Sequence, residues 1–253
     1  MKTRKSFDNI HEDYLFFGNH STEGSELRKA MFPILTERSQ TEHLRWLDFG
    51  CGSGEFFRGL LAALDRPAAA TDLALVDVDR GYLEEAREKV ARFTAGEVAV
   101  ATSPEELEGD FDLITSKHAL YYVKDLRSTV RALVGLLKPG GLALLVLGGK
   151  ENHQSGLWES AYAAWKLPVP YYRAEDVARE IEAAGFPCET RTVHSSLRFP
   201  DSPDNRQKIL RFLFTGNTAG IAPESLFHFL DPMKQEGDIV IGNTSWLFRV
   251  SPN

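Results

Sequence analysis

The chain has 253 residues, of which 43% are hydrophobic and 26% are charged, and its formal net charge is −7 at pH 7. This length suits one large α/β domain with a substantial core, and the composition is that of an ordinary soluble globular protein. An acidic chain lacks the basic face that phosphate neutralisation requires. The composition therefore argues against nucleic-acid binding as the main task.

The two cysteines, Cys51 and Cys188, lie far apart in the sequence, and we expect free thiols in a reducing compartment. Cysteine and histidine show no metal-ligand spacing, so we expect no metal. The N-terminus lacks the apolar core of a signal peptide, and the longest apolar run, residues 142–148, is too short to span a bilayer. The sequence predicts a soluble, cytoplasmic protein without a membrane partner, either a monomer or a weak homodimer.

Taken in chain order, the predicted elements begin with an amphipathic helix over residues 23–38, which Pro33 is expected to kink or break. The first twenty residues show no clear period. Short apolar strands then alternate with helices, a pattern typical of βαβ units whose parallel sheet is buried on both faces. The predicted strands are 44–49, 73–78, 98–101, 111–115 and 142–147, and the predicted helices are 55–64, 82–93 and 126–137.

The second half of the chain has a different pattern, which we interpret as the substrate side. Residues 200–236 are expected to form a helical insertion that covers a site. We predict a single domain over 1–253, with an N-terminal substrate-cover segment at 1–40, a cofactor-binding core at 44–148 and a substrate-side half at 149–253. The predicted helical stretches are 151–167, 173–184 (ended by Gly185), 205–214 and 223–230, and the predicted strands are 188–199 and 238–250.

The strongest motif is a glycine loop that runs from Asp48 to Gly54 between a predicted strand and a predicted helix. Glycines let the backbone turn tightly and approach a ligand, and the following helix presents free N–H groups. The next strand leads to Asp77, a carboxylate that can accept hydrogen bonds from both ribose hydroxyls of a nucleoside. The glycines are spaced more tightly than in dinucleotide enzymes, and Asp48 can hold an ammonium group.

These residues resemble motif I of class I S-adenosyl-L-methionine (SAM)-dependent methyltransferases, and residues 138–141 resemble that family's turn into its fifth strand. The resemblance covers about residues 44–148 and implies a Rossmann-like α/β fold. Its sheet is mostly parallel and seven-stranded, with helices on both faces and a small helical cover. SAM is the implied cofactor and S-adenosyl-L-homocysteine (SAH) the implied product. The implied cofactor contacts are Asp48, Gly50, Gly52, Gly54, Asp77, Val78 (adenine pocket), Thr102, Ser103 (adenine amine) and Lys117.

A second resemblance concerns the substrate side. Residues 19–23, 120–125 and 242–244 are similar to stretches of the histamine N-methyltransferase family and keep their order. His118 stands where that family has glutamine, so we expect an acceptor other than histamine. The substrate contacts that the resemblance implies are Glu23, His118, Tyr122, Trp158, Tyr162 and Asn243.

The mechanism expected from these residues is in-line methyl transfer to a nitrogen atom. An attacking amine must be neutral, and His118, a side chain that changes charge near neutral pH, can accept its proton. Glu23 can orient a cationic part of the substrate, and Asn243 can both donate and accept hydrogen bonds. We therefore predict that His118, Glu23 and Asn243 are catalytic, acting on a small amine- or imidazole-containing molecule.

Several alternatives stay open at this level. The enzyme can be a small-molecule O- or carboxyl-methyltransferase of a secondary pathway, or a peptide or amino-acid N-methyltransferase. It can also be a regulatory protein that binds SAM without turnover. A nucleotide-dependent oxidoreductase is disfavoured by the spacing of the loop glycines. An assay of amines against phenols and acids separates the enzymatic alternatives.

Overall fold

The computed structural model describes residues 10–214 and 223–253, and the chain folds into two compact units. The core unit consists of Leu27–Leu147, Tyr172–Thr192 and Trp246–Asn253. The accessory unit consists of Met1–Glu26, Gly148–Tyr171 and Val193–Ser245. The chain therefore passes several times from one unit to the other. The single domain expected over residues 1–253 stays a prediction.

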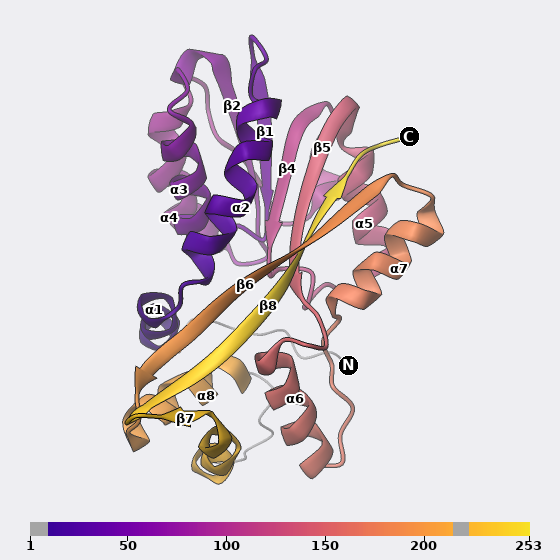
Figure 1. Ribbon diagram of the computed structural model, residues 1–253. Coiled ribbons are helices and arrows are strands. Elements are labelled where there is room, and N and C mark those ends of the chain that lie inside the picture. The colour runs from indigo at the N-terminus through magenta and orange to yellow at the C-terminus, as the bar shows by residue number, and fades with distance from the viewer. Residues whose placement is uncertain (1–9, 215–222) are drawn as a thin grey trace. The chain divides into compact units, whose positions relative to one another are not determined.

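The core unit is a mostly parallel sheet with helices on both faces, and its strands β1 to β5 are all parallel (Figure 1). Helices α2, α3 and α4 cover one face, and α5 and α7 cover the other (Figure 1). The strands are β1 Leu44–Phe49, β2 Thr71–Val76, β3 Ala99–Ala101, β4 Phe111–Lys117 and β5 Leu137–Gly148. The α-helices are α2 Glu23–Arg38, α3 Glu55–Leu64, α4 Arg80–Val90, α5 Leu126–Gly135 and α7 Ala174–Ala184, and the 3-10 helices are η1 Ala68–Ala70, η2 Ala91–Phe93 and η3 Pro104–Glu106.

The strand order is β3-β2-β1-β4-β5-β8-β6, where β6 is Cys188–Pro200 and β8 is Asp238–Val250. The two-residue strand β7, Lys234–Gln235, pairs with β8 beside this path. The chain builds outward from β1 to β3 and then returns to place β4 on the other side of β1. In such sheets ligands bind where the order reverses, beyond the carboxyl ends of the strands. The Rossmann-like α/β fold with seven strands along its path is confirmed.

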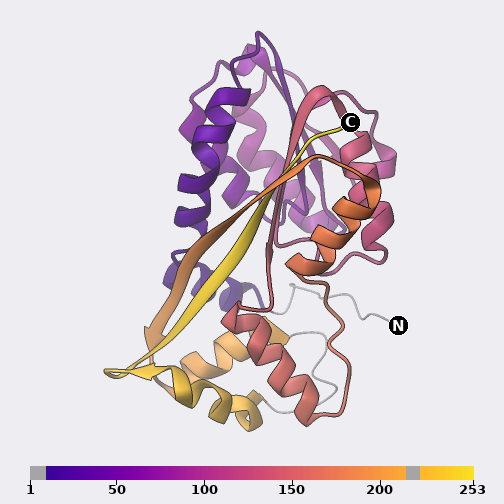
Figure 2. The same ribbon diagram turned by 45° about the vertical axis from the view of Figure 1, so that its right-hand side comes forward.

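The accessory unit contains the helices α1 His11–His20, α6 His153–Ala164, α8 Pro203–Phe214 and the 3-10 helix η4 Pro223–Met233 (Figure 2). Phe17 of α1 stacks on Phe212 of α8 with ring centroids 4.4 Å apart. Beside this contact, the buried carboxylate of Asp13 accepts two hydrogen bonds from the Arg211 guanidinium, at 2.8 and 2.7 Å. Helices α1 and α8 are therefore joined by an apolar and an ionic contact within one unit.

Three details differ from the expectations. Helix α1 was not foreseen, because its buried residues are only Asp13 and Phe17 and leave no apolar period. Helix α2 continues through the exposed Pro33, where water can satisfy the carbonyl that proline leaves without a donor. The stretch expected as a turn, residues 138–141, lies inside β5, where the pairing with β4 shifts register.

The expected insertion over 200–236 is formed by α8, η4 and β7, with residues 215–222 outside the described part. Within residues 10–214 and 223–253, none of the helices combines the length and the hydrophobicity needed to cross a membrane.

Candidate cofactor and acceptor sites

The glycine loop between β1 and α3 has a left-handed backbone at all three glycines, and two of the three positions leave no room for a side chain. Gly50, Gly52 and Gly54 have φ angles of +69°, +50° and +76°, a region that side chains rarely adopt. Space is limiting as well: a Cβ on Gly50 would lie 2.1 Å from the Ala119 Cβ, and one on Gly54 would lie 2.8 Å from the Ala86 Cα. The loop is therefore shaped for backbone contact with a ligand at the start of α3.

Asp77, which follows β2, braces this loop. One carboxylate oxygen accepts the Gly52 N–H at 2.9 Å, and the other accepts the Asp79 N–H at 2.9 Å. Asp79 in turn caps α4 by accepting from the N–H groups of Gly81 and Tyr82. Each carboxylate oxygen can accept a further hydrogen bond, so Asp77 can bind two hydroxyls while it holds the loop.

Asp48, near the end of β1, is a buried acid that accepts a hydrogen bond from an uncharged hydroxyl. Its side chain is 4% exposed, and the Thr115 hydroxyl donates to Oδ1 at 2.7 Å. The Trp46 indole N–H donates to the Thr115 oxygen at 3.2 Å, which directs the hydroxyl proton toward Asp48. Burial, the largest effect, raises the pKa of Asp48 above its usual value. The Thr115 hydrogen bond lowers the pKa, the charge of Asp77 raises it and the charge of Lys117 lowers it, and the resulting pKa is about 7. A cation that arrives here would stabilise the ionised form.

Cys51 lies in the same loop and is 8% exposed. Burial, Asp48 and Asp77 all raise the pKa of its thiol, in that order of size. A thiol that keeps its proton is a poor nucleophile. Cys51 is therefore a buried, protonated thiol of the loop, a free cysteine as expected from the sequence.

His118 directly follows β4, at the same edge of the sheet as the glycine loop. Its φ angle is +55°, which is uncommon for a residue with a Cβ and marks local strain of the kind found at functional sites. The His118 N–H donates to the Val146 carbonyl at 2.9 Å. Its ring stacks on Tyr121, with centroids 5.7 Å apart and planes 6° from parallel. The strained backbone and the stacked ring together fix the direction of the imidazole.

The remaining predicted cofactor contacts have local partners of their own. Val78 is 58% exposed. The Thr102 hydroxyl donates to Glu106 at 2.6 Å, and the Ser103 hydroxyl donates to Glu105. The structure thus brings an acid, Glu106, to the turn where the sequence had suggested only hydroxyls. The Lys117 ammonium lies 5.4 Å from the centroid of the Phe56 ring, and the Tyr122 ring packs edge-on against Tyr121.

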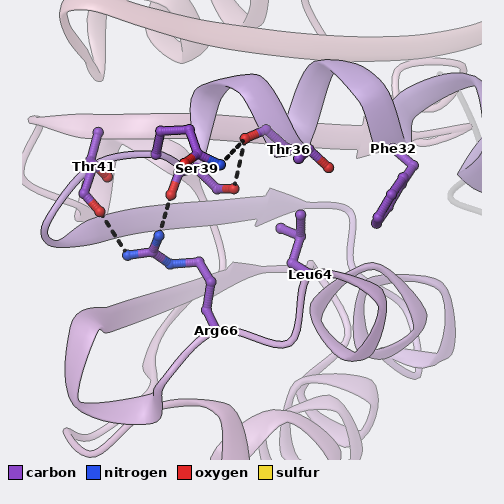
Figure 3. A pocket seen from close by; sticks show the side chains of 7 residues that line it. Phe32, Thr36, Ser39, Thr41, Leu64 and Arg66 are labelled. Carbon is purple, nitrogen blue, oxygen red and sulfur yellow. Dashed lines mark hydrogen bonds between the residues drawn. The ribbon is translucent and has the colours of Figure 1, made fainter.

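A cavity of about 300 Å³ lies elsewhere in the core unit (Figure 3). The Arg66 guanidinium donates to the carbonyl of Ser39, to that of Thr41 at 3.0 Å and to that of Ala70 at 3.2 Å. These residues precede β1 and β2, so the cavity is at the amino ends of the strands, away from Asp48. The Arg66 guanidinium binds backbone carbonyls and so has a structural role. The lining residues are Phe32, Thr36, Ser39, Gln40, Thr41, Leu64 and Arg66.

Glu23 in the accessory unit is held beside β6. The preceding Thr22 donates its N–H to the Ser196 carbonyl at 2.9 Å, and the Ser196 N–H donates to the Thr22 hydroxyl at 2.9 Å. Ser21 forms an antiparallel bridge with Leu197. Glu23 is 4% exposed. The backbone that precedes Glu23 is therefore held beside β6, and the Glu23 side chain is mostly shielded from water.

Asn243 lies on the buried face of β8, in the same unit, and is 2% exposed. Neither atom of its carboxamide has a hydrogen-bond partner among the described residues. Asparagine is depleted in strands, and a buried amide normally has partners. Asn243 therefore has the character of a ligand contact.

Trp158 and Tyr162 belong to an aromatic cluster of the accessory unit. The Trp158 indole N–H donates to the Leu213 carbonyl at 3.1 Å, so only its ring face is available to a ligand. Its ring lies 4.6 Å from that of Tyr171, and the Tyr162 and Trp165 rings are 5.2 Å apart. Burial, and then Tyr171, raise the pKa of Tyr162, so its hydroxyl stays neutral.

The predicted residues thus fall into two sets. His118 and the predicted cofactor contacts belong to the core unit, whereas Glu23, Trp158, Tyr162 and Asn243 belong to the accessory unit. Sequence reasoning missed the residues that support Asp48. Thr115 is the partner of Asp48 in the register of β1 and β4, and nothing in the sequence gives that pairing.

Comparison with known proteins identifies the family of the chain. The model of a family described as "Methyltransferase domain" matches residues 24–190, about two thirds of the 253 residues. The chain belongs to this methyltransferase family.

Among relatives, the chain is 27% identical over 203 residues to a polyketide synthase-nonribosomal peptide synthetase of Aspergillus clavatus, covering 74% of this chain and 5% of that protein. It is 33% identical over 99 residues to juvenile hormone acid O-methyltransferase of Drosophila melanogaster, covering 38% of this chain and 33% of that protein. The chain therefore spans a third or less of the length of these two curated relatives.

Among solved structures, the chain resembles the N-methyltransferase NodS of Bradyrhizobium japonicum in complex with SAH, with a TM-score of 0.51 and 17% identity. The match covers 90% of this chain and 87% of that chain. At this identity the likeness establishes the shared fold.

Proposed function

We propose that the protein transfers a methyl group from SAM to a nitrogen atom of a small amine- or imidazole-containing molecule. The observation that carries the proposal is the buried carboxylate of Glu23 in the same unit as the buried carboxamide of Asn243. A buried carboxylate favours a cationic partner, and a carboxamide supplies a donor and an acceptor. An amine or an imidazole presents these groups.

The cofactor side fits SAM by the chemistry of its residues. SAM supplies, when bound, a methyl group activated by a sulfonium. The backbone of the glycine loop receives the methionine part, and Asp77 can accept from the two ribose hydroxyls. Asp48 is a buried acid whose pKa of about 7 would fall beside an ammonium group. SAH is the expected product.

On the acceptor side, His118 accepts the proton of the attacking nitrogen at one of its imidazole nitrogens. Glu23 orients the cationic part of the acceptor, and Asn243 binds a second polar atom. The aromatic cluster around Trp158 and Tyr162 excludes water, which strengthens these electrostatic contacts. Tyr122 belongs to the same proposed acceptor site.

The test begins with calorimetric titration of SAM and SAH, followed by incubation with SAM and a panel of aryl-alkyl amines and imidazoles. We expect micromolar binding of the cofactor and methylated amines detected by mass. Binding of SAM with product only from phenols or acids would contradict transfer to nitrogen. Absence of SAM binding would contradict the whole proposal.

The relation to juvenile hormone acid O-methyltransferase supports a second candidate, transfer to the oxygen of a carboxylic acid or phenol. Glu23→Gln separates the two candidates. Since a buried carboxylate attracts an amine and repels an acid, the variant should lower methylation of amines and raise that of carboxylic acids. The opposite pattern would favour the second candidate.

We also propose that the protein acts in the cytoplasm as a monomer or weak homodimer. Static light scattering across a concentration series tests the oligomeric state, and a stable tetramer would contradict it.

A further inference from the structure

The neighbouring strands β6 and β8 present a row of polar side chains on their buried face. Asp201 donates its N–H to the Gly237 carbonyl at one end, and Ser251 donates to the Pro187 carbonyl at the other. The two bonds define one antiparallel register, which places Ser195 directly opposite Asn243. Directly opposed residues have Cα atoms about 4.5–5.5 Å apart and side chains on the same face.

The row continues along β8. Asn243 and Ser245 are two residues apart, so their side chains lie on the same face about 7 Å from each other. Ser245 is 1% exposed, and apolar residues occupy this face on both sides of the pair. The flanking residues are Ile239, Ile241 and Leu247.

Helix α6 brings a fourth polar side chain toward the same part of β8. The Asn152 side chain donates to the Thr244 carbonyl at 3.2 Å and accepts the Ser155 N–H at 3.4 Å. Ser155 is 1% exposed. A chain of two hydrogen bonds therefore connects Ser155 to the strand residue between Asn243 and Ser245.

The polar atoms of these side chains share one property. The hydroxyls of Ser155, Ser195 and Ser245 and both amide atoms of Asn243 lack a hydrogen-bond partner in the described part of the chain. Buried polar atoms are normally bonded, because removing them from water without replacement is unfavourable. Five such atoms in one region of one unit indicate a site whose hydrogen bonds are completed by a bound ligand.

We propose that Ser155, Ser195 and Ser245, with Asn243, bind an uncharged hydrogen-bonding group of the methyl acceptor and so determine acceptor specificity. The inference rests on the proposed function, since it assigns this group to the same acceptor as the amine near Glu23. All four side chains are neutral, so a phenol, an imidazole or an amide fits them, whereas a second formal charge would be buried without a counter-charge.

The first test measures thermal unfolding of the free protein. Ser245→Ala and Ser155→Ala each remove an unsatisfied buried hydroxyl and should raise the Tm by roughly 2–4 °C. The control is Ser39→Ala, which removes the hydroxyl of a buried serine, 5% exposed, that donates to the Thr36 carbonyl at 3.2 Å (Figure 3). The control should lower the Tm by a similar amount. A fall for all three variants would show bonded, structural hydroxyls and would overturn the inference.

The second test measures binding, so it does not depend on turnover. Tyramine and 2-phenylethylamine, which differ by one hydroxyl, are titrated by calorimetry into the protein saturated with SAH. The wild type should prefer tyramine by roughly 3–10-fold, and Ser245→Ala should reduce that preference to within twofold. Ser39→Ala should keep the preference.

The outcomes separate this inference from the proposed function. Serine-dependent preference without methylated amine would support the inference and contradict transfer to nitrogen. Methylated amine with equal affinity for the two probes, or a preference unchanged in Ser245→Ala, would overturn the inference alone. Failure of both probes to bind, with no methylated amine, would overturn both.

Discussion

In the core unit the acids near the glycine loop are matched by donors from neighbouring strands and turns, whereas the polar row of β8 has no such match within residues 10–214 and 223–253. Asp77 accepts two backbone N–H groups, and Asp48 accepts the Thr115 hydroxyl. In the accessory unit Asn243 and Ser245 are buried as deeply as Asp48, yet their polar side-chain atoms find no partner among the described residues.

Under the proposed function, the difference follows from the two ligands, a constant cofactor at the core unit and a methyl acceptor at the accessory unit. A site that is organised before binding loses little freedom when its ligand arrives, and it suits a cofactor that does not change. Polar atoms left for the ligand gain their hydrogen bonds only on binding, which rejects molecules that cannot supply them. Under the proposed function, the prearranged contacts of the core unit favour tight binding of the cofactor. The contacts that the ligand completes in the accessory unit favour selective binding of the acceptor.

The largest effect expected is on catalysis, from His118→Asn. Asparagine tolerates the left-handed backbone at this position but does not accept a proton near neutral pH. Methylation of an amine should fall by roughly 100-fold or more in kcat, while the SAM affinity stays within about threefold. Single-turnover rates and calorimetry measure the two quantities. An unchanged kcat would remove His118 from the proposed mechanism.

The next effect concerns the prearranged loop and is tested by Asp77→Asn. In the wild type the carboxylate accepts the N–H groups of Gly52 and Asp79. In the variant the amide N–H₂ group would face one of these donors, so one charge-assisted hydrogen bond is lost. The SAM affinity should fall by roughly 100-fold, equivalent to about 2.7 kcal/mol. Asp72→Asn, in the strand that precedes Asp77 but paired with the exposed His43, is the control and should change the affinity less than twofold. Equal effects in the two variants would show that the loop is not braced by Asp77.

The third effect, the smallest for a change of one pH unit, is the pH dependence that Asp48 confers on cofactor binding. Burial raises its pKa to about 7, so the free protein holds a proton there below that pH. The ammonium of SAM favours the ionised form, and its affinity should therefore fall about tenfold per pH unit below about 7. Calorimetric titrations between about pH 5 and about 7 should show this slope in the wild type and a flat profile in Asp48→Asn.

Stability should change with pH in the opposite direction. Because the folded pKa of Asp48 is raised, its contribution to stability is fully present at low pH and is lost as the pH rises through about 7. Asp48→Asn should therefore unfold at a higher temperature than the wild type at pH 8. Thr115→Val, which removes a hydrogen bond that lowers the pKa, should move the binding profile to higher pH. A wild-type profile without slope would contradict the role of Asp48.

Local pattern sufficed where neighbouring residues decide the structure. The bounds of β1, α3 and β8 match those expected, because apolar runs and the glycines between β1 and α3 act within a few residues. The glycine loop and Asp77 were likewise accessible, since the spacing of glycines and an acid after the next strand is a sequence property. The class of fold and the cofactor loop were therefore predictable.

Other features depend on residues far apart in the chain. Helix α1 was missed because its buried Asp13 is matched by Arg211, 198 residues away. The same holds for the pairing of Asp48 with Thr115 and of Ser195 with Asn243. The amino acids at these positions gave no local sign of their partners.

The sequence by itself determined the order of strands and helices, the glycine loop and the candidate residues, because periodicity, backbone freedom and side-chain chemistry are local properties. The tertiary structure decided which acid is buried beside which donor, and hence the raised pKa of Asp48. It also decided the left-handed backbone of His118 and the polar row of β8. Side chains become buried and acquire hydrogen-bond partners only when distant segments pack together. Burial and these partners decide whether an acid is charged and whether a hydroxyl is bonded within the protein.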